Sequence, residues 1–384
     1  MDNATHTLFA LTLARTRLGR AGRGATAALV LASNAPDVDI VATLGGAGNY
    51  LTWHRGPTHG LLGVVGLGVV VAAIVSLALR VLRSSPVAQV SPVAQDFGSA
   101  LHRPARPAAT FRALVPICLI GVLCHVLMDV PTPYGTRFLS PFDWHWFSFD
   151  WMPIIDVYLL ATLAAGLVFG SGSALAKQRN VAIVFSLMAL NYGVRALAHH
   201  EALAIAPRLF GPLLPQPCDQ AAGPGGPAIE DWPRPVVMNP RDSSKRCLVQ
   251  LVANPMFVSP FQWQVIAQLS NAYEMQTINL LDRRFWQPPS EREVLWRRTV
   301  RVPNVWTPPV WTAASTRTAR TFLGFARLPA GRSFTDPSGV TTVRWSDLRF
   351  AGARMALAPP QNDPFSVIVR VAPDGQVLEE HLGP

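Results

Sequence analysis

The sequence predicts an α-helical multi-pass membrane domain followed by a β-rich extracytoplasmic domain. The 384-residue chain is 49% hydrophobic and only 15% charged, whereas soluble domains usually carry about a quarter charged residues. Its long apolar runs lie before residue 200. The second half has frequent prolines and arginines and short runs that are typical of strands. Together these features predict about four spans with a short N-terminal helical hairpin, and then a sheet-forming region.

Four apolar runs predict the membrane spans: 61–82, 114–130, 153–170 and 181–198. The first run is long enough to cross the hydrocarbon core of a bilayer, and the other three are near the short limit. Two shorter apolar segments, 4–14 and 24–35, flank four arginines and predict a hairpin of short helices with a basic turn. A secretory signal cleaved after the Ala-Ser-Asn-Ala sequence at 32–35 is the alternative for this region.

Basic residues predict the orientation in the membrane. The 80–113 loop holds five arginines and one aspartate, the 171–180 loop holds Lys177 and Arg179 without an acid, and the hairpin turn holds four arginines. Such loops face the cytoplasm in most membrane proteins. We therefore expect a protein of the cytoplasmic (inner) membrane, with 36–60, 131–152 and the C-terminal domain outside.

The predicted domains are a membrane domain (1–200), a Pro/Gly-rich linker (201–245) and a β-rich domain (246–384). Turn residues at Ser270-Asn271 and at Pro373-Asp374-Gly375 predict two hairpins in the last domain. Cys218 and Cys247 can form a disulfide if their compartment is oxidising. No CxxC occurs, so the sequence does not support a thiolate zinc site.

The net charge of +10 comes from 33 basic and 23 acidic residues. Such a charge can indicate nucleic-acid binding. Here, however, many arginines lie beside apolar runs, as they do in loops at the cytoplasmic face of a membrane. We therefore expect a lipid bilayer as the partner, and no nucleic acid.

Histidines and aspartates converge on the predicted outer side of the membrane domain. Imidazoles and carboxylates near membrane depth are costly, which makes them functional candidates. The group contains His6, His54, His59, His125, His145, His199 and His200 together with Asp37, Asp39, Asp129, Asp143, Asp150 and Asp156.

The pair with the clearest spacing is His125 and Asp129, in the sequence HVLMD. Residues four apart lie on one face of a helix, so this pair can offer two ligands to one divalent ion. The alternative is a core histidine near a helix-end aspartate. Asp37 and Asp39, in PDVD, point the same way if the chain is extended, but a turn or helix cap explains them as well.

The sequence HRGPTH at 54–59 predicts a turn at its Gly-Pro pair that brings His54 and His59 toward one centre. Arg55 is suited to balancing negative charge on a substrate or transition state. Asp156, at the start of the third run, is a further candidate ligand, or a partner of a ligand. Asp143 and Asp150 are expected to be solvated loop residues, and residues 199–201 an interfacial helix end.

A site of several imidazoles and carboxylates without cysteine suits Zn²⁺, Mn²⁺ or Fe²⁺. We expect a divalent metal as the cofactor, with zinc preferred over manganese and iron. Such an ion lowers the pKa of a bound water and makes hydroxide available near neutral pH.

The ordered motifs resemble the YdjM-like family, bacterial inner-membrane proteins regarded as metal-dependent hydrolases. The resemblance is carried by Thr5-His6, by residues 36–39, 54–59 and 125–129, by Pro133-Tyr134-Gly135 and by Pro141-Phe142, with weaker support from 254–255, 260–263 and Tyr273. It implies a metal site formed by His6, Asp37, Asp39, His54, His59, His125 and Asp129. The HxxxD element is also similar to one in zinc-dependent phospholipase C and P1-type nucleases, which favours phosphoester chemistry. The long 83–113 loop and the β-rich extension depart from the short family pattern.

We therefore predict a membrane-bound hydrolase in which metal-activated water attacks a phosphoester or related ester at the outer face of the cytoplasmic membrane. Its substrate would be a lipid or an envelope-associated molecule. The predicted catalytic residues are Asp39, His54 and Arg55, and the predicted metal ligands are the seven residues above with Asp156. The alternative is a non-enzymatic membrane protein that binds metal or recruits a partner through its C-terminal β-rich domain. A transporter is disfavoured, because the polar residues gather at one edge of the spans and give no midplane pathway.

Overall fold

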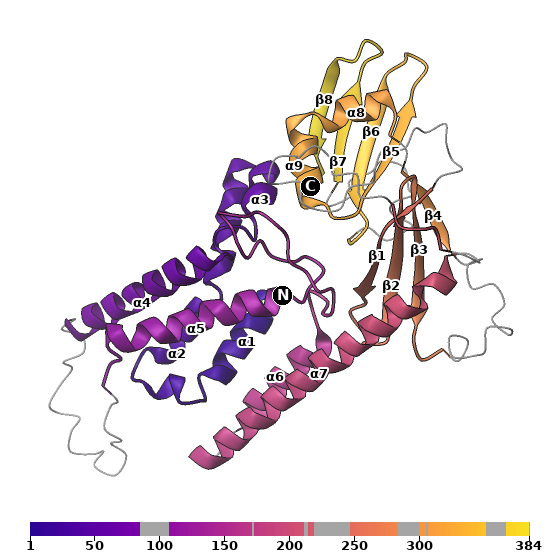
Figure 1. Cartoon of the computed structure of the whole chain (residues 1–384). Helices are drawn as coiled ribbons and strands as arrows, with labels where there is room; N and C mark the ends of the chain where they lie inside the picture. Colours follow the sequence, from indigo (N-terminus) through magenta and orange to yellow (C-terminus); the bar gives the residue numbers. More distant parts are fainter. Residues whose placement is uncertain are drawn as a thin grey trace, which may run out of the picture. The chain divides into compact units, whose positions relative to one another are not determined.

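Figure 1 shows the computed structural model of the chain. The structure describes residues 1–84, 107–170, 173–210, 214–218, 246–282, 299–304, 306–350 and 366–383. The chain divides into two compact units, which are treated separately below. The helical unit comprises Met1–Val38, Pro57–Asp129 and Val157–Asn191, and the β-rich unit comprises Asp39–Gly56, Val130–Asp156 and Tyr192–Pro384.

The helical unit is a bundle of apolar helices. Its elements are α1 (Asn3–Leu13), η1 (Leu18–Arg20), α2 (Ala25–Ala32), the start of η2 (Ala35–Gly45), α4 (Leu61–Ser84), α5 (Phe111–Asp129), α6 (Val157–Phe169) and the first half of α7 (Ala174–Leu209). Helix α5 packs against α2 and α4, and α1 packs against α2 and α6. A Cβ at Gly121 of α5 would lie 2.8 Å from the Cβ of Ala32. The glycine therefore allows α2 and α5 to approach closely.

Among the described residues, three helices are long and apolar enough to cross a membrane: Leu61–Leu82 in α4, Phe111–Asp129 in α5 and Leu175–Leu209 in α7. They confirm the predicted spans at 61–82, 114–130 and 181–198. A fourth candidate is the bent pair of α2 and η2, which meet at 45°. The helix α6, in the predicted span 153–170, has only 13 residues, or about 20 Å. It is shorter than predicted because helical structure begins only after Asp156.

The basic segments of the helical unit meet at one end of the bundle. Arg15 donates hydrogen bonds to the carbonyls of Gly166 (2.8 Å) and Leu167 (2.6 Å) at the end of α6. The backbone of Arg23 bonds to Pro107 and Ala109, just before α5 begins. The basic turn therefore lies at the end of the unit where α6 ends and α5 starts. Arg103 and Arg106 of the predicted 80–113 loop lie outside the described residues.

The β-rich unit contains two antiparallel sheets among its described residues, each with its strands in sequence order. One sheet is formed by β1 (Leu248–Pro255), β2 (Gln262–Leu269), β3 (Ala272–Asn279) and β4 (Val300–Pro303). The other is formed by β5 (Pro329–Thr335), β6 (Thr341–Asp347), β7 (Ser366–Val371) and β8 (Val377–Leu382). Both predicted hairpins are confirmed: β2 and β3 turn at Ser270-Asn271, and β7 and β8 turn at Gly375, whose φ is 87°. Two helices of this unit, α8 (Pro308–Ala314) and α9 (Arg317–Phe325), were not predicted from the sequence.

Each sheet of the β-rich unit is covered by helical residues. The C-terminal part of α7 packs Ala202 and Ile205 against Trp263 and Val265 of β2. The second sheet forms a core with α9 and with residues of α3 (Ala47–Trp53) and the 130–156 loop. The segments 39–56 and 130–156 therefore belong to the β-rich unit, and α7 continues past the predicted start of the linker at 201. The domain limits at 200 and 245 stay a prediction.

The 130–156 loop is fixed to the C-terminal part of the unit by an ion pair and by a hydrogen bond from an arginine to its backbone. Arg327 contacts both carboxylate oxygens of Asp150, at 2.9 and 2.7 Å, and Asp150 is only 4% exposed. Arg349 donates to the carbonyl of Pro133 at 3.0 Å. Asp150 is therefore not the solvated loop residue that the sequence predicted, because its charge is compensated by an arginine almost 180 residues away in the chain. Asp143 is exposed, as expected.

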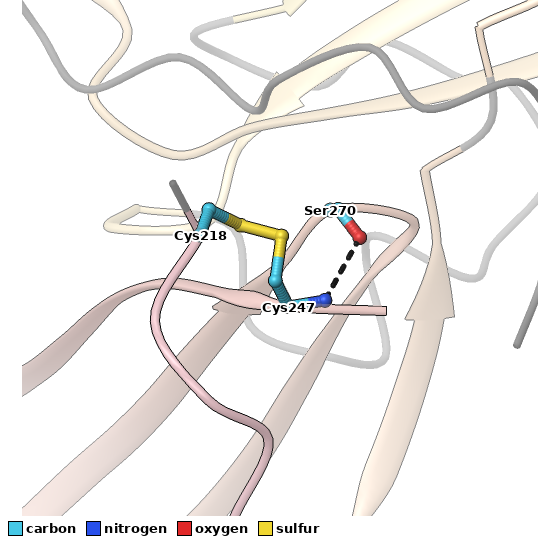
Figure 2. The surroundings of a disulfide bond; sticks show 3 residues. All are labelled: Cys218, Cys247 and Ser270. Atoms are coloured by element: carbon cyan, nitrogen blue, oxygen red, sulfur yellow. Dashed lines mark hydrogen bonds between the residues drawn. A yellow bond between two sulfur atoms is a disulfide. The ribbon is translucent and has the colours of Figure 1, made fainter. Parts of the chain in front are cut away.

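A disulfide joins Cys218 to Cys247, as the sequence suggested for an oxidising compartment (Figure 2). The amide of Cys247 also donates to Ser270 Oγ at 3.2 Å, and the amide of Cys218 donates to the carbonyl of Leu248 at 2.8 Å. These bonds hold the chain that follows α7 at the first residues of β1. Residues 219–245 of the predicted linker lie outside the described residues.

Candidate metal centre

Four side chains of the helical unit form a compact cluster: Asp37, His59, His125 and Asp129. Each offers one ligand atom, and the four atoms all lie within 4.8 Å of one another. Asp37 lies on η2, His59 on the turn before α4, and the other two on the last two turns of α5. The i,i+4 spacing of HVLMD therefore places both side chains on one face of α5, as predicted, and two other elements complete the group.

The spacing of the ligand atoms fits one metal ion. His125 Nε2 lies 3.2 Å from Asp129 Oδ2, 3.5 Å from Asp37 Oδ1 and 3.2 Å from His59 Nε2. His59 Nε2 lies 3.4 Å from Asp129 Oδ2 and 3.6 Å from Asp37 Oδ1. Nitrogen and oxygen ligands bound at about 2.0–2.2 Å in a tetrahedral arrangement lie about 3.3–3.6 Å apart. The donor set and its spacing are thus suitable for a divalent ion.

Hydrogen bonds on the far side of each imidazole orient the two histidines. His125 Nδ1 lies 2.7 Å from the carbonyl oxygen of Ser33, the residue that ends α2. Because a carbonyl only accepts, this nitrogen carries the proton and Nε2 keeps its lone pair for the cluster. His59 Nδ1 lies 3.1 Å from Thr58 Oγ1. Partners of this kind are typical of histidines that bind metals.

Burial distinguishes the members of the cluster. The side chains of His59, His125 and Asp129 are 0% exposed, whereas that of Asp37 is 19% exposed. A buried carboxylate needs compensation by positive charge. Asp37 is therefore the member of the cluster that is in contact with solvent.

His6 lies against the cluster. Its ring stacks on that of His125 with 3.8 Å between centroids, and its Nε2 lies 3.5 Å from Asp129 Oδ1. The amino group of Met1 also contacts Asp129 Oδ1. Five of the predicted metal residues are thus gathered in the helical unit: His6, Asp37, His59, His125 and Asp129.

Asp39 and His54 form a second group, which belongs to the β-rich unit. His54 Nδ1 lies 3.0 Å from Asp39 Oδ1, and Asp39 Oδ2 accepts the backbone N–H of Arg55 at 2.8 Å. The ring of His54 stacks on Tyr50 at 4.4 Å. The carboxylate of Asp39 therefore orients the imidazole of His54.

Arg55 and Tyr134 flank this pair. The Arg55 guanidinium lies 4.6 Å from the centre of the Tyr134 ring and donates to the carbonyl of Gly135 at 3.1 Å. Its φ of 53° is unusual for a residue with a side chain, and the bond from its N–H to Asp39 helps to maintain it. Burial raises the pKa of Tyr134 well above its ordinary value, so its phenol stays protonated.

The other candidates lie elsewhere. Asp156 pairs with Arg195 at 2.5 Å, and both side chains are fully buried in the β-rich unit. Its role as a ligand stays a prediction. His199 lies 5.5 Å from Trp263, ring to ring. The sequence did not indicate Ser33 or Arg195 as partners, because a backbone carbonyl leaves no signal in a sequence and the arginine lies 39 residues from its aspartate.

Comparison with known proteins gives the family. An uncharacterized protein of Bacillus subtilis (strain 168), YfhP, is 26% identical over 148 residues. This match covers 38% of the present chain and 37% of the length of YfhP. No solved structure matches the chain. The family model described as YdjM inner membrane protein matches residues 1–202, which include all four residues of the metal cluster. The chain therefore belongs to the YdjM inner membrane protein family.

Proposed function

We propose that this protein is a metal-dependent hydrolase of the cytoplasmic membrane that cleaves a phosphoester, or a related ester, of an amphiphilic envelope molecule. The main observation in support of this proposal is the cluster of Asp37, His59, His125 and Asp129, whose ligand atoms lie within 4.8 Å of one another. Zinc is the proposed ion, because five of the six separations between the ligand atoms are 3.2–3.6 Å, close to those of tetrahedral coordination by nitrogen and oxygen. When bound, such an ion supplies Lewis acidity and lowers the pKa of a water molecule.

The residues of the chain have distinct roles in this proposal. The four clustered side chains hold the ion, with His6 beside them. Asp39 lies two residues after the cluster residue Asp37 on η2. His54 Nε2 takes a proton from the attacking water and returns one to the leaving group, while Asp39 keeps the proton on Nδ1. Arg55 contributes positive charge beside them.

We further propose that the C-terminal domain is extracytoplasmic. The disulfide between Cys218 and Cys247 supports this orientation, because disulfides are rare in the cytosol. The basic turn with Arg15 and Arg23 supports it as well, since it lies at the end of the helical unit where α5 begins, whereas the metal cluster lies at the opposite end of α5.

The orientation predicts the redox state of the four cysteines in living cells. Rapid alkylation of intact cells, followed by denaturation and mass spectrometry, should find Cys218 and Cys247 bonded, and Cys118 and Cys124 as thiols. The two thiols of α5 serve as internal controls for the alkylation. A reduced Cys218–Cys247 pair at steady state would contradict the extracytoplasmic placement.

Removal of the metal tests the hydrolase directly. The protein in detergent or vesicles should hydrolyse at least one member of a panel of phosphate mono- and diesters, including phospholipids. Dialysis against a chelator should abolish the activity, and Zn²⁺ or Mn²⁺ should restore it, because the four ligands alone do not activate water.

The same experiment separates the proposal from its alternative. Stoichiometric metal without hydrolysis of any ester in the panel, together with a protein that co-purifies only when residues 246–384 are present, would support a metal-binding or partner-recruiting protein. Absence of bound metal in every loading condition would contradict the hydrolase and the metal-binding alternative, and would leave only the partner-recruiting one.

A further inference from the structure

The hairpin between β1 and β2 ends in an apolar tip. Met256, Phe257 and Val258 are 37%, 54% and 71% exposed, and they are consecutive in the chain. Leu281, which follows β3, is 64% exposed and lies at the same end of the sheet, because the amide of Leu280 donates to the carbonyl of Phe261 at 2.8 Å. No charged residue occurs between Arg246 and Glu274. Exposed apolar groups of this kind normally have a partner.

The tip is an ordered part of the sheet. Met256 N–H donates to the carbonyl of Gln262 at 3.0 Å, and the indole of Trp263 donates to the carbonyl of Pro260 at 3.0 Å. Phe261 N–H donates to Ser259 Oγ at 3.2 Å. The apolar side chains of the tip are therefore held out by a hydrogen-bonded turn.

The position of the tip along α7 identifies the partner. Pro255, which precedes the tip, is paired with Trp263, and the Trp263 ring lies 5.5 Å from that of His199 on α7. The other end of β1 is bonded to the chain that follows α7, at Cys218. The tip therefore lies at the end of the sheet nearer the membrane-spanning part of α7.

At the same level, the exposed side chains of α7 change from apolar to polar. Leu197 is 71% exposed, as expected of a side chain in lipid, whereas His200 and Glu201 are exposed polar residues. The helix has 36 residues, about 54 Å, and a hydrocarbon core of about 30 Å needs only some 20 of them. Beyond His199, α7 is covered by the sheet instead, through Ala202 and Ile205. The boundary of the bilayer thus lies near His199 and Trp263.

We propose that the hairpin tip, Met256–Val258 with Leu281, inserts into the surface of the bilayer from which α7 emerges, and that it seats the β-rich unit on the membrane. The partner is lipid, because the tip is uncharged, is apolar and lies at the level where the exposed apolar surface of α7 ends. Apolar side chains at such a boundary penetrate about 5–10 Å into the headgroup region. This inference does not depend on the hydrolase activity.

Fluorescence quenching in vesicles tests the inference. Val258→Cys, in a background of Cys118→Ala and Cys124→Ala, is labelled with an environment-sensitive fluorophore and reconstituted into phosphatidylcholine–phosphatidylglycerol vesicles. We expect quenching by lipids brominated in their acyl chains, and at least about twofold weaker quenching by aqueous iodide than at the control site. The control is Gln376→Cys in the same background, at the exposed turn between β7 and β8 of the same unit. The orientation of the protein in the vesicles affects both labels equally.

Two results would overturn the proposal. Equal iodide quenching at positions 258 and 376, without quenching by brominated lipid, would show that the tip is in water. Protection from iodide without quenching by brominated lipid would show that protein, such as a second copy of the chain, covers the tip. The labelled Gln376→Cys variant also serves as a control for folding. Its label is quenched by iodide when the protein is folded, and both results above are measured against this quenching.

Discussion

The double variant His125→Ala/Asp129→Asn should lose metal binding and hydrolysis together. Both residues offer ligand atoms to the cluster, and His125 Nε2 lies 3.2 Å from Asp129 Oδ2. Removal of two of four ligands leaves Asp37 and His59, which is too few for stable coordination. We expect at least about a tenfold decrease in metal bound per chain, a larger effect than that of removing a partner of a ligand. Elemental analysis of the purified protein measures this change.

Because both residues are buried, the measurement needs controls for folding. His200→Ala removes an exposed imidazole of α7 and should leave the metal content unchanged. Circular dichroism of the double variant should retain the helical signal of the wild-type protein, since the rest of α5 is apolar apart from Arg112 in its first turn. Full metal content in a folded double variant would show that the ion binds elsewhere, and equal loss in His200→Ala would show that the loss is not specific.

Replacement of His54 should abolish turnover while the metal stays bound. His54 is absent from the metal cluster, and its Nδ1 faces Asp39 Oδ1 at 3.0 Å. If its Nε2 transfers protons, then His54→Gln should lower kcat by about 10²–10⁴-fold, the usual contribution of general acid–base catalysis. The metal content should match that of the wild-type protein. His145→Gln, at an exposed site of the same unit, serves as the matched control.

The variant Asp39→Asn tests the same role of His54 in a second way, by changing which nitrogen of its ring carries the proton. Asp39 Oδ2 accepts the N–H of Arg55 at 2.8 Å. An asparagine would keep its oxygen at this N–H and turn its NH₂ group toward His54 Nδ1. That arrangement favours the proton on Nε2, which removes the base, so kcat should fall while the metal content again stays unchanged. Loss of metal in either variant would instead make these residues ligands, as the sequence resemblance implied. Full activity in both would remove them from the reaction.

The local features of the fold followed from the sequence. Apolar runs of sufficient length predicted α4, α5 and the central part of α7, because the thickness of a bilayer sets the length of a span. Turn residues predicted the β2–β3 and β7–β8 hairpins, because the turn geometry depends on a few adjacent residues. The spacing of His125 and Asp129 predicted that they share a helix face. Each of these predictions depends on neighbours in the chain.

The composition of the cluster was decided by tertiary structure. Asp37 and His59 reach His125 only because η2 and the start of α4 pack at the end of α5, and the carbonyl of Ser33 orients His125. The sequence resemblance had placed Asp39 and His54 with the same ligands, yet these two pair with each other.

The tertiary structure also decided to which unit each loop belongs. The sequence alone determined that apolar helices precede strands, and that eight of the nine histidines lie in the first 200 residues. The structure decided that 39–56 and 130–156 pack with the C-terminal sheets, through contacts such as the pair of Asp150 and Arg327. The physical reason is that hydropathy and periodicity report on neighbouring residues, whereas charge pairing and packing between distant segments depend on how the chain returns on itself.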